Sequence, residues 1–203
     1  MPRTLAGVTT APRPRATAPA AGALETFLRD IEQKAYRFAH YELWDRDAAL
    51  DAVQDSMLRL ATRYRDRPPS EWPALFFTIL RHRTVDAQRA RRLDRLRGLF
   101  GGRRRSDADD NEAASWEQLP APAHEGPETV IATAQQRRAL DAALQQLPAR
   151  QRQVFLLREL QELSSAETAQ VLGCSVGAVK QHHFRALTAL RALLTEGWNH
   201  DRR

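Results

Sequence analysis

The chain has few of the features that mark secreted, membrane or β-rich proteins. Its 203 residues include one cysteine, Cys174, which excludes an internal disulfide and any cysteine-rich zinc site. No run approaches the roughly 18 apolar residues of a membrane span, and the first twenty residues hold no apolar core like that of a signal peptide. No segment carries the alternating pattern of a strand. We therefore expect an all-α, cytoplasmic protein without membrane insertion.

Familiar motifs of catalysis are also missing. The sequence contains no HExxH metal-binding pair, no glycine-rich phosphate loop and no Gly-x-Ser-x-Gly nucleophile turn. We expect no enzymatic activity, no cofactor and no metal.

Charge is unevenly distributed around a net value of +6. Residues 81–105 hold ten Arg and two Asp, whereas residues 106–129 hold seven acidic residues and no Lys or Arg. An arginine block of this kind suits a surface that contacts phosphates, since each neutralised phosphate releases counterions. It equally suits the solvated face of a helix, and charge alone leaves both interpretations open.

Composition and apolar spacing divide the chain into four segments. Residues 1–22 are rich in Ala and Pro and predict a disordered tail, and residues 98–129 predict a flexible acidic linker. Residues 23–97 and 130–197 carry the three-and-four spacing of amphipathic helices. The prediction is two small helical domains joined by the linker.

The second domain contains a helix-turn-helix pattern. Ser164 and Glu167 have the spacing of a capping box, Gly173 can take the positive φ of the turn, and Ser175 can cap the next helix. Val179 falls where that helix packs back. The usual role of such a motif is to set its second helix into the major groove of DNA. We expect Cys174, in the turn, to act as a small buried apolar side chain.

Two parts of the chain resemble a known family. The run from Leu147 to Arg158, with the helix-turn-helix after it, looks like region four of bacterial sigma factors. The run from Asp51 to Asp55 resembles their region-two signature, and the helix around Arg81 resembles the segment that reads the minus-ten element. Over roughly residues 23–196 the chain is similar to the extracytoplasmic-function (ECF) group. The resemblance implies a sigma factor that binds core RNA polymerase and directs promoter recognition and DNA melting.

The resemblance assigns roles to three sets of residues. Those expected to contact the clamp of core polymerase are Asp51, Gln54, Asp55 and Leu58. Those expected at minus-ten DNA, where aromatic and cationic groups would hold unstacked bases, are Tyr64, Arg65, Trp72, Phe77, Arg81, His82, Arg83, Asp86 and Arg89. Those expected at minus-thirty-five DNA, at the exposed start of the recognition helix, are Ser175, Val176, Gly177, Ala178, Lys180, Gln181, His182 and Arg185.

Simpler structural roles remain open at several positions. Phe76 and Phe155 are expected in the core, Phe77 either in the core or at DNA, and His183 in the packing stripe of the last helix. The flap of polymerase would dock near Val154. The family further implies promoter DNA and an anti-sigma factor as partners.

Two other classes of function fit parts of the sequence. A stand-alone helix-turn-helix regulator would bind duplex DNA without core polymerase, its first domain sensing a ligand or forming a dimer. A structural RNA-binding protein would use the arginine block but leaves the order of the two domains unexplained.

The adjacent charge blocks generate one prediction. If the acids of residues 107–128 screen Arg103–Arg105 or the arginine helix before them, replacing these acids with Asn and Gln should raise the affinity of the free protein for promoter DNA. Fluorescence anisotropy without polymerase measures this affinity. An unchanged affinity would count against screening.

Overall fold

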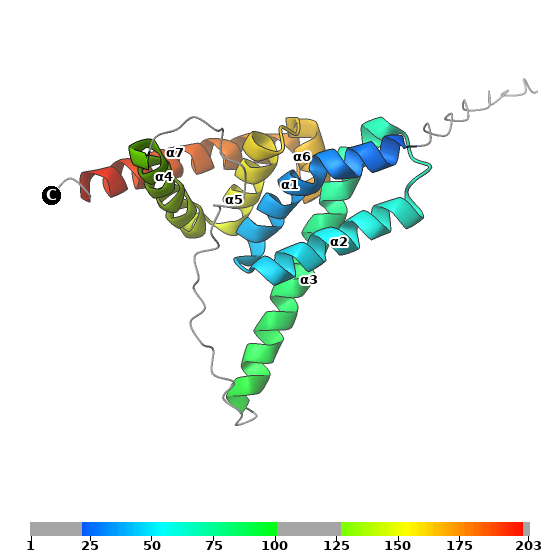
Figure 1. Cartoon of the computed structure of the whole chain (residues 1–203), viewed down its shortest axis with the longest axis horizontal. Coiled ribbons are helices and arrows are strands. Elements are labelled where there is room, and N and C mark those ends of the chain that lie inside the picture. Colours follow the sequence, from blue (N-terminus) through cyan, green and yellow to red (C-terminus); the bar gives the residue numbers. More distant parts are fainter. Residues whose placement is uncertain (1–21, 101–126, 201–203) are drawn as a thin grey trace, which may run out of the picture.

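The computed structural model describes residues 22–100 and 127–200, and within these ranges every regular element is helical (Figure 1). The expected all-α class is confirmed. The N-terminal half contains α1 (Ala23–Leu43), α2 (Arg46–Arg63), the single turn η1 (Pro69–Glu71) and α3 (Trp72–Phe100). The C-terminal half contains α4 (Pro127–Gln146), α5 (Ala149–Phe155), the π-helical turn η3 (Leu156–Leu160), α6 (Ser165–Leu172) and α7 (Val176–His200).

Local sequence signals explain where the N-terminal helices begin and end. Asp45 caps α2, its carboxylate accepting a 2.8 Å hydrogen bond from the backbone N–H of Ala48. Two prolines after α2 prevent the helix from continuing, and Pro69 begins η1. The C-terminal part of α3 extends away from the body of the molecule as an arm (Figure 1). Its root is fixed by Arg91, which lies 2.6 Å from Asp45 and also donates to the backbone of α1.

The helix that begins at Ala149 does not stay α-helical to its end. It changes to a wider π-helical turn at Leu156, where the N–H of Gln161 donates to the carbonyl of Leu156 over 3.1 Å. Glu162 then takes a positive φ of 57°, which is unusual for a residue with a side chain, and ends the helix. The apolar spacing did not predict this turn, which is a rare feature that occurs mostly as a single turn inside an α-helix.

The helix-turn-helix forms as predicted. The capping box is complete, with Ser164 Oγ and the Glu167 carboxylate each accepting from the other residue's backbone N–H. Gly173 has φ 64° and ends α6, while Ser175 Oγ accepts from the N–H of Ala178 over 3.1 Å and caps α7. Val179 is fully buried, where it packs α7 back on the domain.

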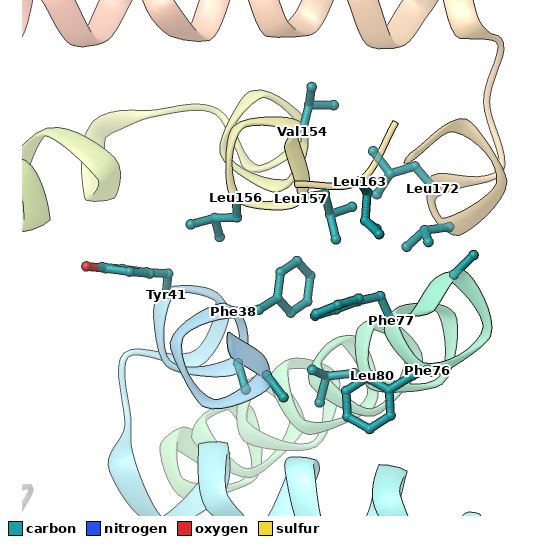
Figure 2. Packing of buried hydrophobic residues seen from close by; sticks show 14 of the residues in the cluster. Phe38, Tyr41, Phe76, Phe77, Leu80, Val154, Leu156, Leu157, Leu163 and Leu172 are labelled. Carbon is teal, nitrogen blue, oxygen red and sulfur yellow. The ribbon is translucent and has the colours of Figure 1, made fainter. Parts of the chain in front are cut away.

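A single apolar core joins the two halves. Phe38 of α1 and Phe77 of α3 lie across from Leu157, Leu163 and Leu172 of the C-terminal half (Figure 2). All five side chains are buried. The helices α5 and α6 therefore lie against α1 and α3, and in this structure the two halves form one packed body (Figure 1).

The boundaries differ slightly from those expected. The third helix continues to Phe100 and the first helix of the second half begins at Pro127, so each extends three residues into the segment assigned to the linker. The predicted tail and the rest of the linker lie outside the described residues. Within residues 22–100 and 127–200, no helix is long and apolar enough to cross a membrane.

The turn at Gly173 generates a stability prediction. Gly173→Ala should lower the free energy of unfolding by about 1–2 kcal/mol, because a Cβ at positive φ approaches the following carbonyl. Gly173→Asn should lose less, since Asn tolerates this conformation. A Cβ at this position meets no other atom within 4 Å, so the loss would report backbone strain alone. Urea unfolding measures it, and equal losses for Ala and Asn would contradict the explanation.

Candidate nucleic-acid interface

The residues expected at the minus-thirty-five element gather at the start of α7. Ser175, Val176, Gly177, Lys180, Gln181 and Arg185 are exposed there, and Ala178 and His182 are half-buried. Helical spacing sets Gly177, Lys180 and Gln181 on neighbouring positions of one face. Lys180 and Gln181 have the donors and acceptors that guanine and adenine edges require. The side chains that hold α7 in place, such as Val179 and Ala186, lie on the opposite, buried side.

The same exposed face holds one residue that sequence reasoning missed. Phe184 follows Lys180 by four positions, and 70% of it is exposed. A large aromatic side chain so open to solvent is uncommon, and Phe is one of the groups that can contact a thymine methyl. The sequence contained a signal for this residue, because a phenylalanine on the polar side of an amphipathic helix is expected to be exposed.

His183 supports α7 from the other side. Its Nε2 lies 2.7 Å from Glu159 Oε1 in η3, and the ring is half-buried. This confirms the packing role expected from its position in the apolar stripe. The contact ties the recognition helix to the π-helical turn.

The residues expected to contact polymerase form one exposed face of α2. Asp51, Gln54, Asp55 and Leu58 follow at three- and four-residue steps, and 64% of Leu58 is exposed. An exposed leucine flanked by carboxylates suits a partner with both apolar and basic groups. Asp55 lies 3.8 Å from Arg83 of α3, which keeps this face beside the start of the arginine-rich helix.

The structure does not bring the residues expected at minus-ten DNA to one surface. His82, Asp86 and Arg89 are exposed along α3, and Arg65 is exposed in the loop after α2. Tyr64 is half-buried at the end of α2. These five residues are available to nucleic acid in the described arrangement.

Of the four remaining members, Arg83 is half-buried and pairs with Asp55, and the two aromatic side chains are occupied by packing. Trp72 and Phe77 are each 1% exposed, Trp72 against Phe27 with ring centroids 5.6 Å apart and Phe77 against Phe38 at 5.7 Å. Neither ring can stack on a base in this arrangement. Phe76 is also buried, as expected of a core residue. Arg81 is half-buried, and its burial, followed by the like charge of Arg150, lowers the pKa of its guanidinium.

A buried carboxylate lies where α1 meets the C-terminal half. Glu42 is 3% exposed, and both its oxygens are engaged by α5. Gln153 Nε2 donates to Oε2 over 2.7 Å, and Arg152 Nε lies 3.4 Å from Oε1. Sequence reasoning missed this cluster, although an acid inside the otherwise apolar end of α1 was a signal.

Val154, expected near the polymerase flap, is fully buried, and Phe155 is half-buried beside the core.

Further polar contacts surround this cluster. Tyr41 donates to Asp141 over 3.0 Å, Gln161 Nε2 donates to the carbonyl of Lys34 over 3.0 Å, and Lys34 lies 3.4 Å from Glu162. All join residues at least 100 positions apart in the sequence. Among the described residues, no three of His, Cys, Asp and Glu group as metal ligands would.

Glu42 generates a pH prediction. Burial raises its pKa despite the opposing effects of Gln153, Arg152 and Arg81, so the folded chain holds this proton more tightly than the unfolded chain does. Ionised Glu42 therefore costs stability above its unfolded pKa of about 4.3, and the cost disappears below that value. Glu42→Gln should gain stability relative to the wild type as pH rises from 4 to 7.

Urea unfolding at several pH values measures this difference. Glu42→Ala is the matched variant, because it leaves Arg152 and Gln153 without their acceptor and should lose about 1–3 kcal/mol at pH 7. A constant difference between Glu42→Gln and the wild type across this range would contradict the raised pKa.

Comparisons with known proteins agree with this geometry. Residues 137–190, which include the helix-turn-helix, match the family described as sigma-70, region 4. The chain is 34% identical over 149 residues to the ECF RNA polymerase sigma factor EcfG of Rhodopseudomonas palustris, covering 73% of this chain and 72% of that protein. It is 32% identical over 147 residues to the ECF RNA polymerase sigma factor SigD of Mycobacterium tuberculosis, covering 71% of this chain. That match spans 62% of the length of SigD.

A solved structure shares the fold. It is the sigma factor RpoE in complex with the anti-sigma factor NepR from Bartonella quintana, similar with a TM-score of 0.58 and 24% identity over 84% of this chain and 98% of that one. Together with the identity to EcfG over most of its length, the helix-turn-helix and the all-helical fold show that the chain belongs to the ECF RNA polymerase sigma factors.

Proposed function

We propose that this chain is a sigma factor that binds core RNA polymerase, recognises promoter DNA at two elements and assists its melting. The observation that carries the proposal is the exposed row at the start of α7, held on a complete helix-turn-helix by buried residues. It supports insertion of α7 into the major groove at the minus-thirty-five element. Lys180 and Gln181 would contact base edges, and Arg185 a phosphate.

The exposed face of α2 supports binding to the polymerase clamp. Asp51 and Asp55 would pair with basic groups of the partner, and Leu58 would lose water from its exposed side chain. His82, Asp86, Arg89 and the loop at Arg65 would contact minus-ten DNA. Trp72 and Phe77 could join them only if the core rearranged.

The chain has no need of its own catalytic groups in this role. A subunit that directs polymerase to promoters acts by binding both polymerase and DNA, and it carries out no reaction itself. We include an anti-sigma factor among its partners, since the solved relative from Bartonella quintana is bound to one. We also propose a cytoplasmic location, because a protein with this role must reach polymerase and chromosomal DNA.

The test is run-off transcription with core polymerase and promoter fragments. The full chain should give discrete transcripts that core polymerase alone does not give. Asp51→Ala/Asp55→Ala should lose core binding and transcript together, because it removes both carboxylates of the α2 face. Lys180→Ala/Gln181→Ala should keep core binding and lose dependence on the upstream element.

A matched control is Asp30→Ala, which removes an exposed acid from another helix, α1. It should transcribe as the wild type does. Stable, sequence-specific duplex binding by the chain alone, with no transcript from core polymerase, would favour a stand-alone regulator instead.

A further inference from the structure

The arm of α3 carries apolar side chains that the rest of the fold does not cover. Leu93 is 53% exposed and Leu96 is 44% exposed. Both follow Arg91, which lies 2.6 Å from Asp45 and fixes the root of the arm. Helical spacing places Arg91 on the opposite side of α3, so the two leucines face away from the contact at the root. Their apolar surface loses water only if something else covers it.

Arginines flank these leucines. Arg89 and Arg92 are exposed and lie on the same side of α3, at the steps of a helical face. Arg89 lies 3.7 Å from Asp86 in an exposed pair of small net value, and among the described residues Arg92 has no ion pair. We call the surface formed by Arg89, Arg92, Leu93 and Leu96 the arm face. It suits a partner that offers both acidic and apolar groups.

Nucleic acid would satisfy only part of the arm face. Phosphates could pair with Arg89 and Arg92, but a phosphate backbone offers little apolar surface to Leu93 and Leu96. An acidic protein surface with an exposed leucine would satisfy both kinds of group. The arm face therefore favours a protein partner.

The chain itself carries such a surface on α2. The α2 face, formed by Asp51, Gln54, Asp55 and Leu58, has its members at steps of three, one and three residues, and the arm face repeats these steps. Each face extends over about 10 Å of helix. Laid side by side in parallel, they would set the carboxylates of α2 opposite the arginines of the arm. At the other end, Leu58 would meet Leu96.

One molecule cannot bring its own two faces together. The helix α2 and the arm start from the same point, where Arg91 meets Asp45, and run in different directions from it (Figure 1). Residues 81–97 contain no Pro or Gly at which α3 could bend sharply. The arm therefore cannot fold back over α2. Contact between the two faces requires a second copy of the chain.

We propose that the arm face of one copy docks on the α2 face of a second copy, so that the free chain self-associates through opposite charges and exposed leucines. In a pair related by a twofold axis, each copy contributes one arm face and one α2 face. The self-association does not depend on the proposed function. If that function holds, pairing also covers the face that would contact polymerase.

Sedimentation equilibrium of the full chain, without polymerase or DNA, tests the association. At low salt the average mass should rise with concentration from one chain toward two. Added salt should weaken the association, because the paired charges lie at an exposed surface. A wild-type chain that stays monomeric at every concentration would overturn the proposal and leave the proposed function standing.

Charge exchange identifies the two faces. Arg89→Glu/Arg92→Glu makes the arm face acidic, and Asp51→Lys/Asp55→Lys makes the α2 face basic. Each variant alone should associate at least tenfold more weakly than the wild type, because like charges then meet. An equal mixture should recover the wild-type association constant within about threefold, since every acidic face again finds a basic one. A mixture that associates no better than either variant alone would refute docking between these faces.

The matched control is Arg137→Glu/Arg138→Glu, which makes the same change in net charge through two exposed arginines of α4. It should associate as the wild type does. A loss equal to that of the arm variant would show that net charge alone governs association, which would contradict docking. Circular dichroism should show the same helix content in every variant, because all the exchanged side chains are exposed.

Discussion

The burial of Phe38 and Phe77 against Leu157 and Leu172 is the contact on which the whole arrangement depends. Each half of the described chain has about 75 residues, and a domain of this size buries only about 60–65% of the surface that its unfolded chain exposes. Joining the halves removes further apolar surface from water. The position of α7 relative to α2, and therefore of one expected binding surface relative to the other, follows from that shared core.

Polar groups give this apolar contact its specificity. Leucine and phenylalanine side chains could pack in several registers, whereas Glu42 is satisfied only where Arg152 and Gln153 meet it. The cost is a carboxylate removed from water, whose pKa rises as a result. Because the buried carboxylate gives specificity but costs free energy, the contact can be well defined and only moderately stable.

Sequence predicted the local features well, because their causes are local. Ser164, Glu167, Gly173 and Ser175 cap and end helices through neighbours at most four residues away, and the structure confirms each. It did not predict the contacts of Glu42, whose partners lie 110 and 111 residues away. The family resemblance placed Trp72 and Phe77 at a DNA-binding surface, yet a helix that packs on two sides buries residues on more than one face. The roles of the exposed residues remain predictions.

In the helix-turn-helix, the residues of α7 that hold the helix in place are separate from those that it exposes to solvent. Val179 and Ala186 fix where α7 lies, and the capping box and Gly173 fix where α6 begins and ends. Lys180, Gln181 and Phe184 are exposed and do not take part in the core. Mutations there can accumulate at almost no cost to folding. Under the proposed function, descendants of this protein could therefore acquire new target sequences without first acquiring extra stability. Ser175 is the exception, since this residue, which we expect to face DNA, also caps the helix.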